Sequence, residues 1–519
     1  MKGKLELMEK ADAARPVSHA ATVEEALTVT GFGKYNLCLL LVCTGSLQAM
    51  GLDMFGSSFT VAAAVCDLHL TLTQQALLTG IPLAGAVLGA QLWGYVCDAR
   101  GRRLTLVVSM AAGAALGSCS SLAPGCVSMA VLKLLSATFT SASNSGAYTL
   151  VGECCDARSR GRAMLLCTCA LMCCQAVAAV ITYPILLLDF SYPIEFLGIN
   201  YRPWRLLVLA LYIPCLLVAY LLTHFEESPK FLASKGRYEE ALDVLKRIYA
   251  CNTGKGRDEF PIKKLIPEIG EEESSSTEGC SFFGAMWRQT AALFRPPLLT
   301  TTLQLYYLVA VIYMTGSGFL LWLPYIMNNL FAVLETGGGQ NMNLCSVIAM
   351  TPSDDVLITE NNATLTEVCN DTIQNTTLIS SIIYGSLAMC ANLVLSLTAG
   401  SRKRLAMLCI LTVSSTSALL VNLVPVPLAG VMFYFFFVMS ALSMGILSVY
   451  FVELYSTSVR GMAACLSVMV GRSSAFIGVN AIGALLVNNC EATFYGWSIL
   501  LLSAFVFTWF LPRDKDPQK

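Results

Sequence analysis

Long apolar runs separated by short polar loops repeat along the whole 519-residue chain. An α-helix needs about 20 apolar residues to cross the hydrocarbon core of a bilayer. Runs of this kind lie at roughly 34–62, 74–97, 104–122, 126–152, 163–188, 204–224, 298–328, 378–399, 405–424, 428–452, 463–487 and 497–511. The pattern therefore predicts an all-α membrane protein with twelve transmembrane helices.

Polar segments divide these spans into two groups of six. The expected parts are a cytoplasmic segment 1–33, a six-helix bundle 34–224, a cytoplasmic linker 225–297, a second six-helix bundle 298–511 that includes a long loop 329–377, and a tail 512–519. Within the linker, Tyr238, Leu242, Leu245 and Tyr249 recur at helical spacing with charges on the opposite face. We expect a short surface helix there, lying against the bundle.

Composition supports the membrane assignment, since 55% of the side chains are hydrophobic and only 13% are charged. Most of the 21 cysteines lie inside apolar runs, and no pair of them recurs with zinc-site spacing, so no metal site is expected. The chain has no phosphate-binding glycine loop and no nucleophile paired with a base. We therefore expect neither an enzyme nor a cofactor, and no nucleic-acid partner.

Lysine and arginine are distributed unequally between the loops. The segment 225–297 contains eleven of them, whereas the loop 329–377 contains none. Because cytoplasmic loops carry the excess of basic residues, both termini are expected in the cytoplasm and the loop after the seventh span outside it.

That outer loop contains three N-x-S/T sequons, at Asn362, Asn370 and Asn375. Their clustering on the side predicted from charge favours N-glycosylation. Cys345 and Cys369 lie in the same oxidising compartment, where a disulfide between them and two free thiols are both open.

An internal repeat links the two groups of spans. The pattern E-x₆-R-G occurs at Glu153–Gly161 after the fourth span and at Glu453–Gly461 after the tenth, 300 positions apart. Two six-span halves related by duplication are a plan typical of transporters.

The stretch Gly94–Arg103 reads G-x-x-x-D-x-x-G-R-R, and we expect a turn opened by Gly94 and closed by Gly101. It resembles the signature of the major facilitator superfamily, which that family places between its second and third spans. The resemblance implies the major facilitator fold, with two six-helix halves around a central cavity.

The acids and bases of these loops form a predicted cytoplasmic gate, in which Glu153 and Glu453 pair with arginines. The candidate gate residues are Gly94, Asp98, Arg100, Gly101, Arg102, Arg103, Glu153, Arg160, Gly161, Arg404, Glu453, Arg460 and Gly461. Because the second half has no acid that matches Asp98, we expect its gate to be weaker.

Ionisable residues inside spans are costly and need a reason. Asp53 lies about 28 Å from the cytoplasmic start of the first span, and Lys133 lies about 10 Å from the outer start of the fourth. Both residues therefore reach a similar depth in the outer half of the membrane. In a facilitator half these spans line the cavity, and we expect the carboxylate to face the ammonium. Burial favours the protonated acid and a nearby cation favours the ionised one, so a changing separation would load or release a proton.

Simpler interpretations remain open for these residues: a permanent salt bridge, or a Lys133 side chain that snorkels to the surface. Arg472 would snorkel or bind an anionic solute. Trp322 would be a cavity wall or an interfacial anchor. Weaker candidates for the cavity are Asn144, Gln175, Asn392 and Asn480.

Further motifs narrow the family. Glu227-Ser-Pro-Lys230 is similar to the P-E-S-P-R motif of sugar porters, with Glu226 where that family has proline. Gly31–Lys34, Met50–Phe55, Arg202–Arg205 and Trp322–Pro324 resemble the synaptic vesicle glycoprotein 2 and related-transporter family. That resemblance extends, in patches, over nearly the whole chain, and it includes a glycosylated loop after the seventh span.

The chain also departs from that family. Its outer loop is about fifty residues long and lacks pentapeptide repeats, and Met50 replaces the first of the two acids that the family has in the first span, leaving Asp53. Pocket positions that the family fills with aromatic and acidic residues are Gly316, Ser317, Met444 and Ser448 here. We expect a pocket that has smaller walls and is less acidic.

Together these features predict a monomeric, multi-pass transporter that moves a small organic solute by alternating access, coupled to protons, in a synaptic or secretory vesicle or the plasma membrane. One alternative is a vesicle glycoprotein that acts as a receptor or trafficking platform with little transport. Another is a polyspecific organic-ion facilitator. Relatives of that kind usually carry their glycosylated loop after the first span, where Cys66–Thr73 is too short for one.

Overall fold

The computed structural model describes residues 20–267, 290–291, 293–296, 298–335, 342–350, 373–398, 402–455, 457–486 and 489–512. Within these residues, eleven helices are long and apolar enough to cross a membrane, or twelve when the bent pair α8–α9 counts as one span. The predicted all-α fold is confirmed.

The spans of the first half are α3 (Lys34–Ala64), α4 (Leu72–Arg100), α5 (Arg102–Cys119), α6 (Cys126–Thr140) with α7 (Ala142–Cys154), α8 (Ala157–Met172) with α9 (Cys174–Leu186), and α10 (Pro203–Leu222). Those of the second half are α14 (Leu299–Glu335), α16 (Asn375–Thr398), α17 (Lys403–Leu423), α18 (Pro427–Val438) with η5 (Met439–Leu442) and α19 (Ser443–Leu454), α20 (Thr457–Leu485), and α21 (Cys490–Trp509).

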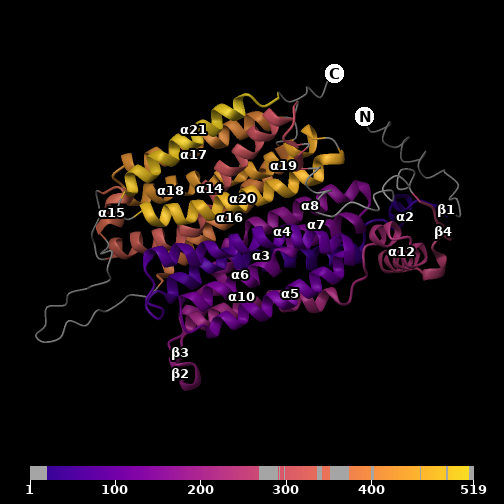
Figure 1. Ribbon diagram of the computed structural model, residues 1–519, viewed down its shortest axis with the longest axis horizontal. Helices are drawn as coiled ribbons and strands as arrows, with labels where there is room; N and C mark the ends of the chain where they lie inside the picture. The colour runs from indigo at the N-terminus through magenta and orange to yellow at the C-terminus, as the bar shows by residue number, and fades with distance from the viewer. Residues whose placement is uncertain are drawn as a thin grey trace, which may run out of the picture.

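The two halves lie side by side as separate bundles (Figure 1). They meet where α4 packs against α20 and where α9 packs against α16. Small residues allow the close approach, since a Cβ atom added to Gly385 would lie 2.7 Å from Ala176 across the second contact. The two bundles therefore contact each other along two seams, α4–α20 and α9–α16.

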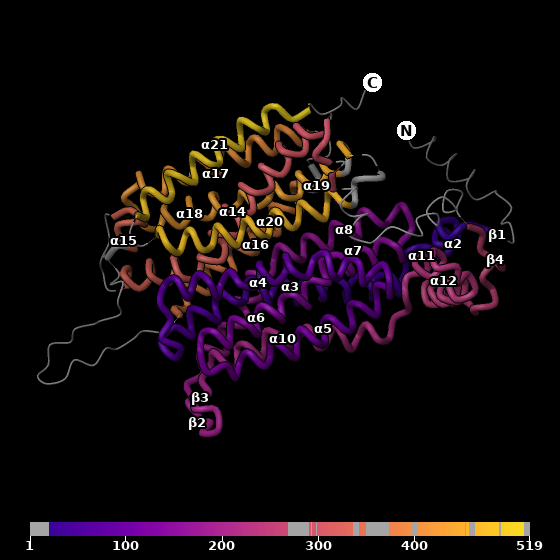
Figure 2. Tube along the Cα trace, in the orientation of Figure 1, coloured from indigo at the N-terminus to yellow at the C-terminus, as the bar shows by residue number. Residues whose placement is uncertain are grey.

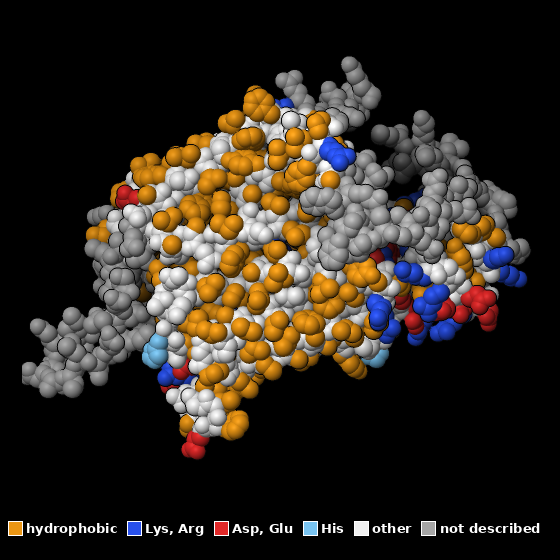
Figure 3. Space-filling view, viewed as in Figure 1, with side chains coloured by type: hydrophobic (Ala, Val, Ile, Leu, Met, Phe, Trp, Pro, Cys, Tyr) orange, Lys and Arg blue, Asp and Glu red, His pale blue; other side chains and the backbone are white. Residues whose placement is uncertain are grey.

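Apolar side chains cover the sides of both bundles (Figure 3). The most exposed include Leu41, Leu88, Ile213, Leu428 and Ile499, all on the spans. Exposed apolar side chains in such numbers belong against lipid rather than water.

Charged side chains gather at one end of the molecule, which we call the basic end (Figure 3). Here α2 (Val23–Thr30), α11 (Pro229–Ser234) and α12 (Tyr238–Thr253) pack together (Figure 2), beside the parallel pair β1 (Ala20–Ala21) and β4 (Lys264–Leu265). Helix α12 confirms the surface helix predicted in the linker. Helix α2 was not expected, although Thr22 and Glu25 form a capping box whose T-x-x-E pattern marks its start.

The opposite end, which we call the hairpin end, carries a short antiparallel pair formed by β2 (Tyr192–Ile194) and β3 (Ile199–Tyr201). It also carries α15 (Leu344–Met350), which packs against α17, α18 and α21. Asn375 is exposed at the start of α16. The other two sequons, at Asn362 and Asn370, lie outside the described residues.

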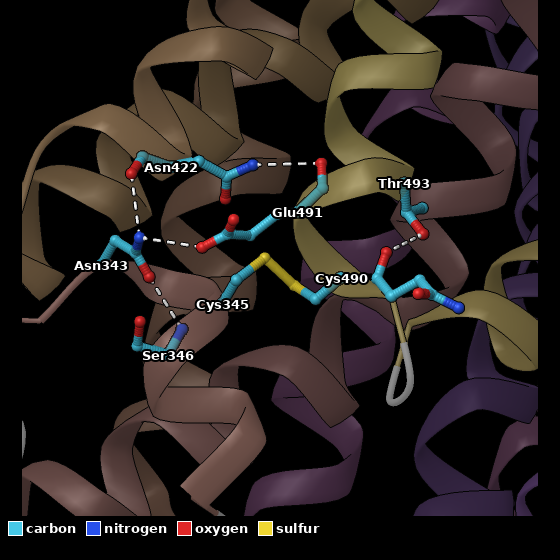
Figure 4. Close-up of a disulfide and its surroundings, with 8 residues drawn as sticks. Asn343, Cys345, Ser346, Asn422, Cys490, Glu491 and Thr493 are labelled. Atoms are coloured by element: carbon cyan, nitrogen blue, oxygen red, sulfur yellow. Dashed lines mark hydrogen bonds between the residues drawn. A yellow bond between two sulfur atoms is a disulfide. The ribbon is translucent and has the colours of Figure 1, made fainter.

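A disulfide joins Cys345 on α15 to Cys490 at the start of α21, with their Cα atoms 5.5 Å apart (Figure 4). The proposed pairing of Cys345 with Cys369 is therefore wrong, because α15 turns Cys345 toward α21; Cys369 lies outside the described residues. Beside the disulfide, Asn343 donates a hydrogen bond of 2.9 Å to the carbonyl of Asn422 on α17. These contacts fasten three elements of the second half together.

Candidate functional site

The loop between α4 and α5 is shorter than expected. Helix α4 continues through Gly94 to Arg100, so the predicted turn at Gly94 is wrong, and the chain reverses only at Gly101, whose φ is 106°. Residues with φ in this region are usually glycine because it has no Cβ atom. Asp98 consequently lies on the last turn of α4, one helical turn before Arg102.

Arg102 is the centre of the gate in the first half. Its Nη2 atom lies 3.1 Å from Asp98 Oδ1 and 3.1 Å from Glu153 Oε1, and its guanidinium stacks over the ring of Phe231 at 4.7 Å. The predicted pairing of Glu153 with an arginine is confirmed. Arg102 therefore joins α4, α5 and α7 to the linker helix α11.

Glu227 joins the predicted gate residues in the structure, and the sequence interpretation missed it. Its carboxylate accepts backbone N–H hydrogen bonds from Arg102 (2.9 Å) and Arg103 (3.1 Å), at the positively polarised start of α5. Arg103 in turn donates to the carbonyls of Leu222 and Thr223 at the end of α10. The sequence feature that could have identified Glu227 is an acid directly after the sixth span.

The matching region of the second half has fewer contacts among the described residues. Lys403 forms an ion pair with Glu453, so the base is a lysine rather than the expected arginine, because Arg404 stacks on the ring of Trp509 at 5.2 Å. Arg460 and Gly461 belong to α20, and their side-chain environment is outside the described set.

The remaining gate candidates have separate roles. Arg160 donates to the carbonyl of Gly152 at 2.7 Å and pairs with Glu24 Oε1 at 2.6 Å, which ties α8 to α2. Although partial burial opposes the effect, ion pairs with Lys230 and Arg160 lower the pKa of the Glu24 carboxyl. Arg100 is exposed, and open space surrounds Gly161.

Asp53 on α3 is 2% exposed and lies in a closed hydrogen-bond network. Its Oδ1 atom accepts from the hydroxyl of Tyr212 on α10 at 2.5 Å. Its Oδ2 atom accepts from Thr140 at 2.9 Å and from Ser136 at 3.4 Å, both on α6. Sequence analysis found the acid but none of these three donors, which are ordinary polar residues within apolar spans.

Lys133 on α6 belongs to the same region. It is 1% exposed, so it does not snorkel to the surface, and its Nζ atom lies 5.9 Å from the centroid of the Tyr212 ring. Among the described residues it makes no ion pair within 4.0 Å. Asp53 and Lys133 are thus brought together as expected, with Tyr212 contacting both rather than with a direct salt bridge.

A small cavity of ≈ 80 Å³ lies between the two halves. It is lined by Met50, Gly51, Met54, Phe55, Leu171, Met172, Gln175, Tyr313, Gly316, Ser317, Leu320, Tyr384, Ala388, Met439, Ala441, Leu442, Met444 and Arg472. Arg472 is the one charged side chain in this lining, and no carboxylate belongs to it. The predicted less acidic pocket agrees with this lining, although Ser448 is not part of it.

Two predicted candidates meet in this cavity, Gln175 from the first half and Arg472 from the second. Arg472 is 8% exposed, and its guanidinium lies 5.9 Å from the centroid of the Tyr313 ring. Gln175 is 1% exposed, and neither its Nε2 nor its Oε1 atom has a hydrogen-bond partner within the described structure. A buried amide without partners is costly unless another molecule supplies them.

The other candidates do not line the cavity. The indole of Trp322 donates to the carbonyl of Val479 at 2.9 Å, so this residue packs α14 against α20 and is neither cavity wall nor interfacial anchor. Asn480 donates to the carbonyl of Phe476 on its own helix, and Asn392 to the Sγ atom of Cys169. Asn144 is half-buried on α7.

Solved structures share this architecture. Over 93% of this chain and 98% of the other, the fold matches the inward-open xylose transporter XylE from E. coli with a TM-score of 0.65 at 15% sequence identity. A structure described as a D-xylose-proton symporter matches with a TM-score of 0.60, also at 15% identity. Two six-helix halves around a cavity are the major facilitator fold.

The family model described as "Sugar (and other) transporter" matches residues 38–320, more than half of the chain. The chain belongs to this family.

Curated relatives match part of the chain. Synaptic vesicle glycoprotein 2A of Rattus norvegicus is 26% identical over 332 residues, which cover 60% of this chain and 44% of the relative. Synaptic vesicle 2-related protein of Xenopus laevis is 28% identical over 57% of this chain and 48% of the relative. Organic cation/carnitine transporter 7 of Arabidopsis thaliana is 26% identical over 50% of this chain and 49% of the relative. The aligned region thus spans about half the length of these relatives.

Proposed function

We propose that the protein is a secondary active transporter that moves a small organic solute by alternating access, with proton coupling through Asp53. The observation that carries this proposal is the cavity between the halves, to whose lining one bundle contributes an unpartnered buried amide and the other a buried guanidinium. Rocking of one bundle on the seams α4–α20 and α9–α16 would open this cavity to each side in turn.

The network around Asp53 supports proton coupling. As an ionised group, the carboxylate is compensated by three hydroxyl donors and by the nearby Lys133 ammonium. Because the donors lie on α6 and α10, a shift of either helix against α3 would remove part of this compensation and favour uptake of a proton. The similarity to structures described as proton:xylose symporters agrees with such coupling.

We also propose that the basic end faces the cytoplasm and the hairpin end faces the lumen or the outside. The distribution of lysine and arginine favours this orientation. So does the disulfide Cys345–Cys490, because disulfides persist in oxidising compartments. Exposed Asn375 would then be available for N-glycosylation. A monomer in a vesicle or plasma membrane fits this arrangement.

The test is a flux measurement with purified protein in liposomes that contain a pH-sensitive dye, screened with pooled sugars, organic cations and organic anions. Wild type is expected to show solute-dependent proton movement. Asp53→Asn is expected to lose it while still exchanging labelled solute across the membrane, because the amide cannot ionise. Asp258→Asn, which neutralises an exposed acid outside the bundle, is the matched control and is expected to behave as wild type.

Unchanged proton movement in Asp53→Asn would assign Asp53 a structural role only. Absence of flux with every pool, from folded and correctly oriented protein, would favour the receptor or trafficking role instead.

A further inference from the structure

The lining of the cavity carries a positive charge and no negative one. Its polar side chains are Gln175, Tyr313, Ser317, Tyr384 and Arg472, and among them only the arginine is charged. Asp53 does not belong to the lining, and the charge that acts on it is that of Lys133. The cavity therefore holds a buried positive charge with no acid beside it in its lining.

An aromatic ring lies beside the guanidinium. The Arg472 guanidinium carbon is 5.9 Å from the centroid of the Tyr313 ring, a separation at which a cation–π interaction acts. A planar guanidinium edge binds a carboxylate through two parallel hydrogen bonds. Gln175, which lines the same cavity from α9, supplies both a donor and an acceptor without partners.

The rest of the wall is apolar and adaptable. Five methionines, Met50, Met54, Met172, Met439 and Met444, line it. Methionine side chains fill irregular spaces and adjust to ligands of different shape. Such a wall suits an apolar body of variable outline rather than the dense hydroxyl pattern of a sugar.

On the basis of the proposed function, we infer that the solute is an amphipathic organic monoanion, whose carboxylate binds Arg472 and Gln175 and whose apolar body contacts the methionine wall. One negative charge neutralises the one positive charge of the cavity. A cationic solute would face the guanidinium unshielded, and a neutral polyol would leave both the charge and the apolar wall unmatched.

The test uses three probes with the same apolar body and different head groups: 4-phenylbutyrate, 4-phenylbutanol and 4-phenylbutylamine. Binding is measured as the rise in the thermal unfolding midpoint of the purified full-length protein with increasing probe concentration. We expect the butyrate to stabilise the wild type, and the alcohol and the amine to stabilise it at least tenfold more weakly.

Variants assign the effect to the cavity. Arg472→Gln is expected to weaken butyrate binding at least tenfold, and Arg472→Lys to retain part of it because the charge remains. Arg257→Gln removes an exposed arginine from the linker and is expected to bind as wild type. Gln175→Leu is expected to weaken butyrate binding several-fold while raising the unfolding midpoint of the ligand-free protein, since it removes an unpartnered buried amide.

Failure of the butyrate to bind, equal binding of the amine or the alcohol, or unchanged binding to Arg472→Gln would overturn the inference. Uptake assays in liposomes separate this result from the proposed function. If 4-phenylbutyrate binds through Arg472 but is not taken up, this result contradicts transport and supports the anion site. Uptake of the amine or the alcohol alone would contradict the anion site and leave transport standing.

Discussion

At the centre of the first half, α3, α6 and α10 meet around a buried carboxylate, whereas α14, α18 and α21 meet in the second half around aromatic rings. These helices are the first, fourth and sixth spans of their halves, so the two centres correspond. Phe319 takes the place of Asp53 and lies 4.7 Å from Phe437, 5.4 Å from Phe494 and 5.5 Å from Trp497, measured between ring centroids. Tyr434 completes the cluster by donating to the carbonyl of Phe319.

The difference shows that the same three spans of each half meet with different chemistry at their centre. A carboxylate with hydroxyl donors can change its protonation state when the helices shift, whereas an aromatic cluster cannot. For the proposed proton coupling, this assigns the proton to the first half, whereas the second half contributes the guanidinium of the cavity. Five stability measurements test this comparison.

The largest effect is expected where one member of the first-half network is removed. Asp53→Ala leaves Lys133 buried beside an unmatched set of donors and should lower the free energy of unfolding by about 3–5 kcal/mol. The double variant Asp53→Ala/Lys133→Met should recover part of this loss. Thermal unfolding of the purified variants measures both, and losses that simply add would show that the two residues are not coupled.

The corresponding change in the second half, Phe319→Ala, should cost a similar ~3–5 kcal/mol by leaving a cavity among aromatic rings. Unlike the loss at Asp53, this loss of stability cannot be offset by changing one partner. The additional substitution Phe437→Ala should therefore lower the free energy of unfolding further. Recovery of stability in the double variant would contradict the comparison.

The disulfide of the second half should rank next. Cys345 and Cys490 are 145 residues apart, so the double serine variant frees a long loop in the unfolded chain and should lose about 2–4 kcal/mol. Replacing Cys390 and Cys409, two exposed cysteines that are free in the structure, is the matched control and should change the unfolding midpoint little.

The sequence predicts a weaker gate in the second half, and a pair of variants tests this prediction. Arg102→Ala breaks pairs with two carboxylates at a side chain that is 11% exposed and should cost about 2 kcal/mol, whereas Lys403→Ala breaks a pair with the half-exposed Glu453 and should cost about 0.2–1 kcal/mol. Arg100→Ala, at an exposed position next to the same turn, is the control. Equal losses at Arg102 and Lys403 would contradict a weaker second gate.

The smallest effect concerns the contact between α2 and the first half. The lowered pKa of Glu24 means that its ion pairs add stability above about pH 4.5, which is lost as the pH falls through the folded-state value. Glu24→Gln should therefore lower the free energy of unfolding by about 0.2–1 kcal/mol at pH 7 and by less at pH 4. Glu239→Gln, at an exposed site on α12, is the control, and a pH-independent difference at Glu24 would contradict this role.

The sequence by itself determined the features that depend on local composition: the spans, the surface helix of the linker, the repeat and the acid–base pairing around Arg102. Apolar length sets the spans, and the gate acid and base are carried by recognisable motifs next to span ends. It also singled out Asp53, Lys133, Gln175 and Arg472, because polar groups inside apolar spans are rare.

Only the tertiary structure decided which of these residues meet. Spans that are apolar on every side do not reveal which face is buried. The donors around Asp53, and the placement of Gln175 and Arg472 in the lining of one cavity, therefore could not be predicted from the sequence. The same reason applies to Glu227, whose partners are backbone N–H groups that every residue possesses. It applies also to Cys345, whose partner was set by the packing of α15 against α21 rather than by its place in the loop.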